Sequence, residues 1–132
     1  MIMLPLNKKS IGDFGERKAA SYLRRHGYRI LERNWRSGKY EIDIIASNLR
    51  DLVFVEVKTR TYHQADVENA PPPKNAVNSA KQEFTRRAAQ NYLYQHPTKK
   101  QPRMDVIEVW LTQSNALEKP KILKIQHLKA AY

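Results

Sequence analysis

The chain lacks cysteine altogether and has only four glycines among its 132 residues. The absence of cysteine excludes disulfides, thiolate nucleophiles, cysteine–zinc sites and iron–sulfur clusters. No glycine-rich phosphate-binding loop is present, which argues against nucleotide-driven chemistry. No apolar run approaches the roughly 20 residues of a membrane span, and the first nine residues lack the long apolar region of a secretory signal. We therefore expect a cytoplasmic protein without a membrane partner.

Acidic residues are also scarce, because 13 Asp and Glu stand against 24 Lys and Arg, which gives a net charge of +11. A domain this basic is expected to bind a polyanion, and nucleic acid is the common one. The length predicts one domain over 1–132, large enough to bury a core without metal or disulfide staples.

The few acidic residues are unevenly placed along the chain. Ten basic and three acidic residues give +7 over 1–40, and eleven and six give +5 over 61–132. Between them, 41–60 has three basic and four acidic residues, a net charge of −1. Carboxylates repel phosphate, so a central acidic segment in a nucleic-acid-binding protein needs a reason, and a metal site would supply one.

The hydrophobic pattern predicts an α/β fold, in which a mixed sheet is flanked by helices. A first helix over 10–26 buries one apolar face and ends at Gly27. Strands over 28–34, 40–46 and 52–60 are joined by short turns and form an antiparallel meander. After a long loop over 61–76, a second helix over 77–96 has Val77, Ala80, Phe84, Ala88 and Leu93 on or near its apolar stripe, and strands over 104–112 and 122–128 follow.

The acidic segment carries the candidate chemistry. Strand alternation over 40–44 puts Glu41 and Asp43 on one face and Ile42 and Ile44 on the other. In the next strand, alternation puts Glu56 on the same face as the lysine two residues later, Lys58. Because a short turn joins these strands, we expect Asp43, Glu56 and Lys58 to converge.

Two carboxylates about 4 Å apart repel by about 4 kcal/mol at an effective dielectric constant near 20. Either one of them is protonated or a divalent cation binds. Carboxylate and carbonyl oxygens suit Mg²⁺ or Mn²⁺, and a lysine beside the ion can orient or help to deprotonate a water. These parts fit the hydrolysis of phosphodiester bonds.

The sequence between Gly12 and Thr112 resembles the YraN family of uncharacterised bacterial proteins. The resemblance lies in Gly15-Glu16, Ala19, Tyr22-Leu23, Gly27-Tyr28-x-Ile30-Leu31, Arg33-Asn34-Trp35-Arg36, Glu41-Ile42-Asp43-Ile44-Ile45-Ala46, Val53-Phe54-Val55-Glu56-Val57-Lys58-Thr59-Arg60, Lys81 and Arg103-x-Asp105-Val106. That family is similar to the PD-(D/E)xK nucleases and to archaeal Holliday junction resolvases. The resemblance implies a restriction-endonuclease-like fold with an αβββαβ core over about 10–112.

The resemblance also implies roles for individual residues. Asp43 and Glu56 would hold Mg²⁺ or Mn²⁺ together with the backbone carbonyl of Val57, Lys58 would be the catalytic lysine, and Glu16 would reach in from the first helix. The substrate would be DNA, branched or damaged, and a homodimer would be plausible. Where the family usually has glycine before Glu-x-Asp, this chain has Tyr40, which could pack over the site or stack on a base.

Residues outside the acidic segment give weaker predictions. We expect the backbone-binding surface to include Arg33, Arg36, Arg60 and Lys81, which would fix position without reading sequence. Trp35 and Tyr62 could stack on unpaired bases, although packing is favoured for Trp35. Asp105 is interpreted as structural, paired with a helix residue. The four histidines have no ligand spacing and are expected at the surface: His26, His63, His96 and His127.

Three functions remain open from the sequence. The first is a metal-dependent DNA nuclease. The second is a nucleic-acid-binding protein that keeps the nuclease fold without turnover. The third is a basic protein-interaction module, which steep salt dependence of DNA binding would separate from the other two.

Overall fold

The part of the chain that the structure describes folds as an α/β arrangement of five strands and two helices. The computed structural model describes residues 8–62, 78–112 and 120–132. In chain order the elements are α1 (Lys8–Arg25), β1 (Arg29–Ser37), β2 (Tyr40–Ser47), β3 (Asp51–Tyr62), α2 (Ser79–Gln95), β4 (Gln101–Thr112) and β5 (Ile122–Leu128). The predicted αβββαβ order with an added edge strand is confirmed, and it agrees with a restriction-endonuclease-like core.

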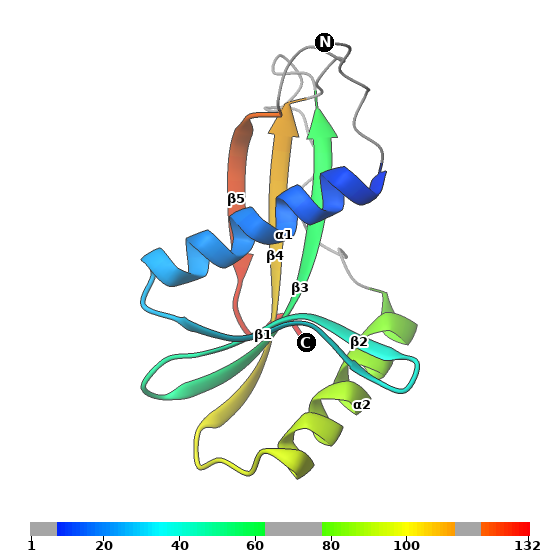
Figure 1. The fold of residues 1–132 in the computed structure, drawn as a ribbon, viewed down its shortest axis with the longest axis vertical. Coiled ribbons are helices and arrows are strands. Elements are labelled where there is room, and N and C mark those ends of the chain that lie inside the picture. Colours follow the sequence, from blue (N-terminus) through cyan, green and yellow to red (C-terminus); the bar gives the residue numbers. More distant parts are fainter. Residues whose placement is uncertain (1–7, 63–77, 113–119) are drawn as a thin grey trace.

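The five strands form one mixed sheet in the order β1-β2-β3-β4-β5. β3 and β4 pair in parallel from Asp51↔Gln101 to Tyr62↔Thr112, and the other three pairings are antiparallel. α1 crosses one face of β3, β4 and β5, while α2 lies beside the β1–β2 hairpin (Figure 1). The parallel pair requires a crossover, and α2 lies in the connection between its two strands.

Local signals explain where the helices start and end. Asn78 caps α2, because its Oδ1 accepts a hydrogen bond from the Lys81 amide at 2.9 Å. α1 ends before Gly27, whose φ of 88° is one that glycine adopts without steric cost. The strands extend beyond their predicted limits: β1 continues to Ser37, β4 starts at Gln101, and the first two residues assigned to the long loop belong to β3. The rest of that loop, which includes His63, lies outside the described residues, and so does Val77.

Two apolar clusters hold the helices to opposite faces of the sheet. On one face, α1 contributes Ala19, Ala20 and Leu23, which pack with buried residues of β2, β3 and β4. On the other face, α2 contributes Ala88, Ala89 and Tyr92, which pack with residues of β2 and β3. Burial of such residues, at about 25 cal/mol per Å² of apolar surface, is the main force that assembles these layers.

The stripe predicted for α2 is partly wrong. The residues it buries are Thr85, Ala88, Ala89 and Tyr92, whereas Phe84 is 47% exposed and Ala80 is also exposed. Small residues let the helix backbone approach the sheet closely, so the contact line follows Thr85, Ala88 and Ala89 rather than the bulkier Phe84. Phe84 is therefore left at the margin of the interface.

A buried polar network centred on Asp105 of β4 joins β3, β4, β5 and the C-terminal segment. Asp105 is fully buried and accepts hydrogen bonds from Arg103 Nε and Nη2 (2.8 Å each), His127 Nε2 (2.6 Å) and the Ala130 amide (3.0 Å). Arg103 also donates to Asp51 (2.9 Å) and to the hydroxyl of a buried tyrosine, Tyr28 (2.7 Å). Although burial raises the pKa of Asp105, these donors lower it more.

This network corrects two predictions from the sequence. The partners of Asp105 come from strands and the C-terminal segment, not from a helix. The side chain of His127 is only 4% exposed, so it is not a surface residue. The contacts of Asp105 with His127 and with the Ala130 amide have no signal in the sequence, because they depend on the register of β4 with β5.

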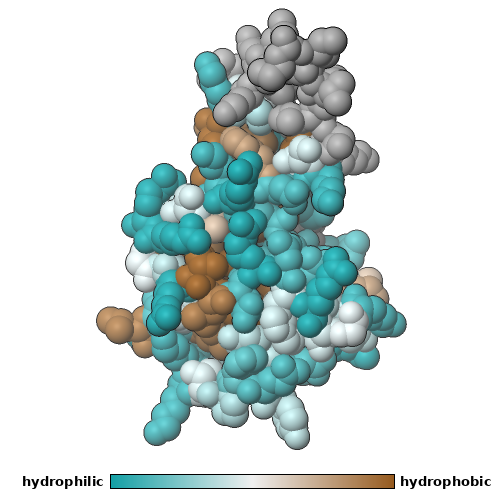
Figure 2. Space-filling view, viewed as in Figure 1, coloured by the Kyte–Doolittle hydropathy of each residue, from teal (hydrophilic) through white to brown (hydrophobic). Residues whose placement is uncertain are grey.

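No helix in the described ranges has the length and apolar character needed to cross a membrane. The face drawn in Figure 2 is mostly hydrophilic, with a limited apolar area near its middle.

At Gly15, α1 lies close against β3. A Cβ there would overlap Thr59 Oγ1 and lie 3.0 Å from both Cβ and Cγ2 of Thr59, so no rotation of that side chain relieves all the contacts. Gly12, one turn earlier, has nothing within 4 Å of an added Cβ. Glycine at position 15 is thus required by packing.

We expect Gly15→Ala to lower the free energy of unfolding by about 1–3 kcal/mol, because α1 must move away from β3. The matched variant Gly12→Ala should be neutral or raise it by about 0.5–1 kcal/mol, because alanine favours the helix. Urea denaturation measures both. Equal stability of the two variants would contradict the close approach.

Candidate active site

The site forms where β2 and β3 separate. Their backbone pairing runs from Ser47↔Leu52 to Ile44↔Val55 and ends there, while β3 continues along β4 to Tyr62. The Val57 amide therefore has no partner strand on that side, and Asp43 Oδ2 accepts its hydrogen bond at 2.8 Å. The Asp43 carboxylate thus accepts the hydrogen bond that the next residue of β2 would otherwise have accepted from β3.

Strand alternation breaks at Asp43, which corrects the prediction that Ile42 and Ile44 share a face. Ile42 packs on the α2 side of the sheet and Ile44 on the α1 side. The pairs on either side, Arg33↔Ile44 and Trp35↔Ile42, place Asn34 opposite Asp43, and Asn34 has a φ of 51°. This left-handed residue makes β1 irregular at that position, and asparagine tolerates the conformation better than most residues.

Glu56 is the most deeply buried acidic residue of the site, with only 6% of its surface exposed. Its Oε2 is buried and has no hydrogen-bond partner in the part of the chain that the structure describes. Burial, and then the neighbouring Asp43, raise the pKa of Glu56 to about 7 against the opposing effect of Lys81. Burial likewise raises the pKa of Asp43, although the Val57 amide opposes the shift.

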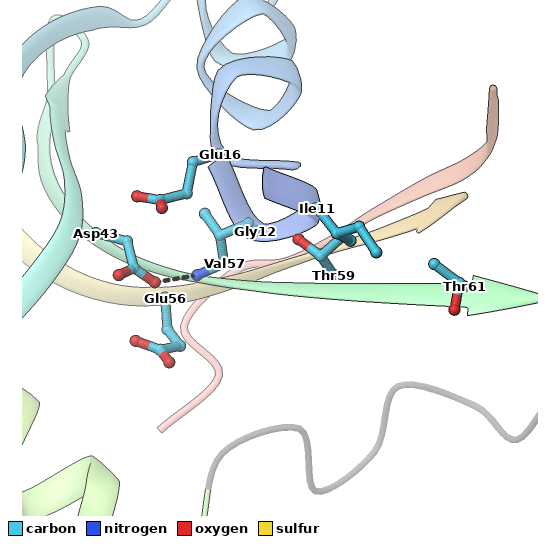
Figure 3. A pocket seen from close by; sticks show the side chains of 8 residues that line it. All are labelled: Ile11, Gly12, Glu16, Asp43, Glu56, Val57, Thr59 and Thr61. Carbon is cyan, nitrogen blue, oxygen red and sulfur yellow. Dashed lines mark hydrogen bonds between the residues drawn. The ribbon is translucent and has the colours of Figure 1, made fainter. Parts of the chain in front are cut away.

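Glu16 approaches from α1, as the resemblance implied. Figure 3 shows its carboxylate on the α1 side of β3, Glu56 on the other side, and Asp43 between them. Burial and then Asp43 raise the pKa of Glu16 to about 7. All three line one open pocket of about 490 Å³, together with Ile11, Gly12, Val57, Thr59 and Thr61.

Asn34 links two of the acidic side chains, a role that the sequence did not reveal. With its amide oriented to hydrogen-bond, its nitrogen lies 2.8 Å from Glu16 Oε1 and 3.3 Å from Glu41 Oε1. In the sequence, Asn34 stands out only through the family resemblance. An asparagine inside a predicted strand, here between Arg33 and Trp35, is a weak signal for a left-handed position, and it could have suggested this irregularity.

Two lysines act on Glu56. The nearer is Lys81 of α2, whose Nζ lies 3.7 Å from Glu56 Oε1. Lys58 is half-buried on β3 and also lowers the pKa of Glu56, but less than Lys81 does. The sequence assigned Lys81 to phosphate binding. The structure places its ammonium beside the carboxylates, and the crossover of α2 could not be positioned from the chain alone.

The other residues predicted to bind nucleic acid differ in their surroundings. Arg33 is exposed on β1 and lowers the pKa of Glu16. Arg36 is paired with Glu41 at 3.6 Å, and Arg60 Nε lies 2.7 Å from an oxygen of the fully buried Glu108. The charge of Arg60 is therefore largely balanced by Glu108 inside the fold, while Arg33 faces solvent near the site.

The donor set fits a hard divalent cation. Asp43 and Glu56 supply carboxylate oxygens, and Oε2 of Glu56 is buried without a partner among the described residues. Val57, whose amide is bonded to Asp43, supplies backbone atoms at the same place. In 8–62, 78–112 and 120–132, no three His, Asp or Glu residues are grouped to hold an ion by themselves. A bound ion would thus rest on Asp43, Glu56 and a carbonyl, with Glu16 as an outer carboxylate.

Tyr132 is a further neighbour that the sequence missed. It lies near α2, where the Arg86 guanidinium is 5.3 Å from its ring centroid. Burial is the main cause that raises the pKa of its phenol, and the nearby Glu56 and Asp43 also raise it. No sequence signal marks a tyrosine so far along the chain as a neighbour of this site.

Comparison with known proteins gives the family of the chain. Residues 15–109 match the model of the uncharacterised protein family UPF0102. The chain belongs to this family. The matched range includes α1 from Gly15, all four strands β1 to β4 up to Val109, and every acidic residue of the site.

Members of UPF0102 from several bacteria are similar over most of their length. A UPF0102 protein of Caldanaerobacter subterraneus subsp. tengcongensis is 41% identical over 131 residues, which cover 98% of this chain and 100% of the relative. One from Alkaliphilus oremlandii is 42% identical over 130 residues, covering 96% and 100%. One from Syntrophotalea carbinolica is 48% identical over 101 residues, covering 76% and 78%. The predicted family resemblance is confirmed.

The raised pKa of Glu56 predicts a particular dependence of stability on pH. Between pH 4.5 and about 7 the folded protein keeps a proton that the unfolded chain has lost, so stability falls as the pH rises through this window. In EDTA at pH 8, Glu56→Gln should therefore raise the free energy of unfolding by about 1–2 kcal/mol. The gain should vanish toward pH 4.5.

Denaturant unfolding at a series of pH values measures this effect. Glu32→Gln, which neutralises an exposed glutamate of β1, should leave the pH profile of the wild type unchanged. A profile for Glu56→Gln that runs parallel to the wild type would show that Glu56 does not ionise with a raised pKa.

Proposed function

We propose that this protein is a metal-dependent nuclease that hydrolyses phosphodiester bonds of DNA. The observation that supports it most is the pair of carboxylates, half-buried Asp43 and buried Glu56, held where β2 and β3 separate, with one oxygen of Glu56 left without a partner among the described residues. Groups with raised pKa values in an open pocket are typical of functional sites. The net charge of +11 supports a polyanionic substrate.

The residues of the site have distinct roles in this proposal. Asp43 and Glu56 hold Mg²⁺ or Mn²⁺, which when bound lowers the pKa of a coordinated water and offsets charge on the phosphate. Lys58 and Lys81 present positive charge to the scissile phosphate beside these carboxylates. Glu16 is held by Asn34 on the opposite side of the pocket, where it orients the attacking water.

Exposed basic residues would hold the DNA backbone around this pocket. Arg33 lies on the surface beside Glu16, in a shallow depression that also includes Asp13, Arg17 and Asn34. Backbone contacts of this kind position DNA without reading its sequence. We therefore propose that the structure of the DNA, rather than its base sequence, determines which substrate is cleaved.

The decisive experiment compares cleavage of linear, single-stranded, flap and four-way-junction DNA in Mg²⁺ or Mn²⁺. Asp43→Asn and Glu56→Gln should each lower the cleavage rate at least 100-fold, because each removes a charged ligand while it preserves shape. Glu32→Gln, which neutralises an exposed glutamate of β1, is the matched control and should cleave at the wild-type rate.

Cleavage that survives Asp43→Asn would contradict the assignment of the site. Failure of the wild-type protein to cleave any substrate, with binding retained, would favour a nucleic-acid-binding protein without turnover. Binding that does not weaken as salt is added would contradict phosphate contact altogether.

Lys81 gives a second test of the metal site. Its ammonium lies 3.7 Å from Glu56 and repels a cation bound there, so Lys81→Met should tighten Mn²⁺ binding severalfold. The same change should lower the cleavage rate about 10- to 100-fold, because a charge on the phosphate is lost. Calorimetry with Mn²⁺ and a cleavage assay separate the two effects.

The exposed Lys99, at the far end of α2, serves as the control, and Lys99→Met should change neither quantity. Weaker Mn²⁺ binding by Lys81→Met would contradict the electrostatic role given to Lys81.

A further inference from the structure

An exposed aromatic pair lies beside the carboxylates. Tyr40 of β2 and Phe84 of α2 have ring centroids 5.7 Å apart, with 32° between their planes. Tyr40 is half-buried and packs against the apolar cluster under α2, while Phe84 is 47% exposed. One ring is thus anchored in the fold and the other is presented to solvent.

Both rings lie near the site, Phe84 along α2 and Tyr40 along β2. Phe84 follows Lys81 by three residues, which puts both on the same side of α2, and Lys81 contacts Glu56. Tyr40 precedes Asp43 by three residues of β2, about 10 Å of extended chain. That distance equals about three stacked nucleotides at roughly 3.4 Å each.

Two cations lie beside the Tyr40 ring. Lys39 Nζ lies 5.7 Å from the centroid of the Tyr40 ring. Hydrogen bonds with Glu83 and then with Tyr40 raise the pKa of Arg87, which places its guanidinium beside the tyrosine hydroxyl. Aromatic faces among basic side chains are what single-stranded nucleic acid requires, because bases stack on the rings and phosphates meet the charges.

Two of the three aromatic residues predicted from the sequence to stack on bases, Trp35 and Tyr62, pack inside the fold, which leaves Tyr40. Trp35 packs edge-on against the buried Tyr92 at 5.3 Å, and Tyr62 packs against the buried Trp110 at 5.1 Å. Among the exposed large apolar residues that the structure describes, Phe84 is the one paired with another ring and adjacent to a residue of the site.

A protein partner fits this surface less well than a base does. A stable protein interface buries about 800 Å² on each side, whereas aromatic side chains bury about 150–250 Å² each. Such a partner would also have to remove water from Lys39, Lys81 and Arg87. A stacked nucleotide covers a ring and neutralises the cations at the same time.

We propose that Tyr40 and Phe84 form a stacking platform for an unpaired base, a few nucleotides from the phosphate that would be cleaved beside Asp43 and Glu56. The faces of bases within a duplex are covered by their neighbours, so the platform selects DNA with unpaired nucleotides beside the cleavage position. This inference rests on the proposed function and narrows its substrate class to single-stranded or flapped DNA.

Binding in EDTA tests the platform separately from catalysis. Fluorescence anisotropy with a labelled 12-nucleotide oligo(dT) and a 12-base-pair duplex gives two dissociation constants for each variant. Phe84→Ala should weaken binding of oligo(dT) about 5- to 100-fold and change duplex binding less than twofold. Phe84→Leu should lose as much, because leucine keeps the apolar contact but offers no aromatic face.

Tyr94→Ala is the matched control, since it removes an aromatic residue that is 89% exposed at the other end of α2. It should bind both DNAs as the wild type does. Thermal unfolding of each variant establishes that it is folded, which the exposure of both side chains favours.

The outcomes separate this inference from the proposed function. Oligo(dT) binding by Phe84→Ala at the wild-type level, or retention of that binding by Phe84→Leu, would overturn the platform and leave the nuclease proposal standing. Failure of the wild type to bind either DNA at low salt would overturn both.

Discussion

The end of the β2–β3 pairing at Ile44↔Val55 is the constraint on which the site depends. Beyond this pair the Val57 amide needs an acceptor, and Asp43 supplies it from its side chain. That hydrogen bond fixes Asp43 next to Glu56 in a region with little solvent. The electrostatics of the site then follow, because two carboxylates that cannot be well hydrated must be protonated, paired with a cation or both.

The chain contains a second buried carboxylate that shows how this burial can be satisfied. Asp105 is fully buried, yet four hydrogen bonds from Arg103, His127 and the Ala130 amide hold its pKa below the ordinary value. Glu56 is almost as buried, keeps one oxygen without a partner among the described residues, and has its pKa raised. Glu108 is also fully buried, beside Arg60, so burial alone does not mark an acid of the site. Glu56 differs because its pKa is raised and it lines the open pocket, a combination typical of functional sites.

Much of the fold could be predicted from the chain, because its signals are local. The helix that ends at Gly27, the meander of β1 to β3, and the proximity of Asp43 to Glu56 follow from periodicity and short turns. Predictions failed where the cause lies in distant contacts. The faces of Ile42 and Ile44 depend on the irregular Asn34, and the position of Lys81 depends on a crossover that only the assembled sheet defines.

The net charge of +11 overstates the cationic surface available to a partner. Arg103 is used by Asp51 and Asp105, and Arg60 lies against the buried Glu108. Cations near the pocket include Arg33 on β1, Lys58 on β3 and Lys81 on α2. Since α2 also carries Phe84, one helix places both a charge beside the carboxylates and an exposed ring one turn away. The crossover helix, which the parallel β3–β4 pair requires for topological reasons, is therefore also the element that, under the proposed function, would select the DNA substrate.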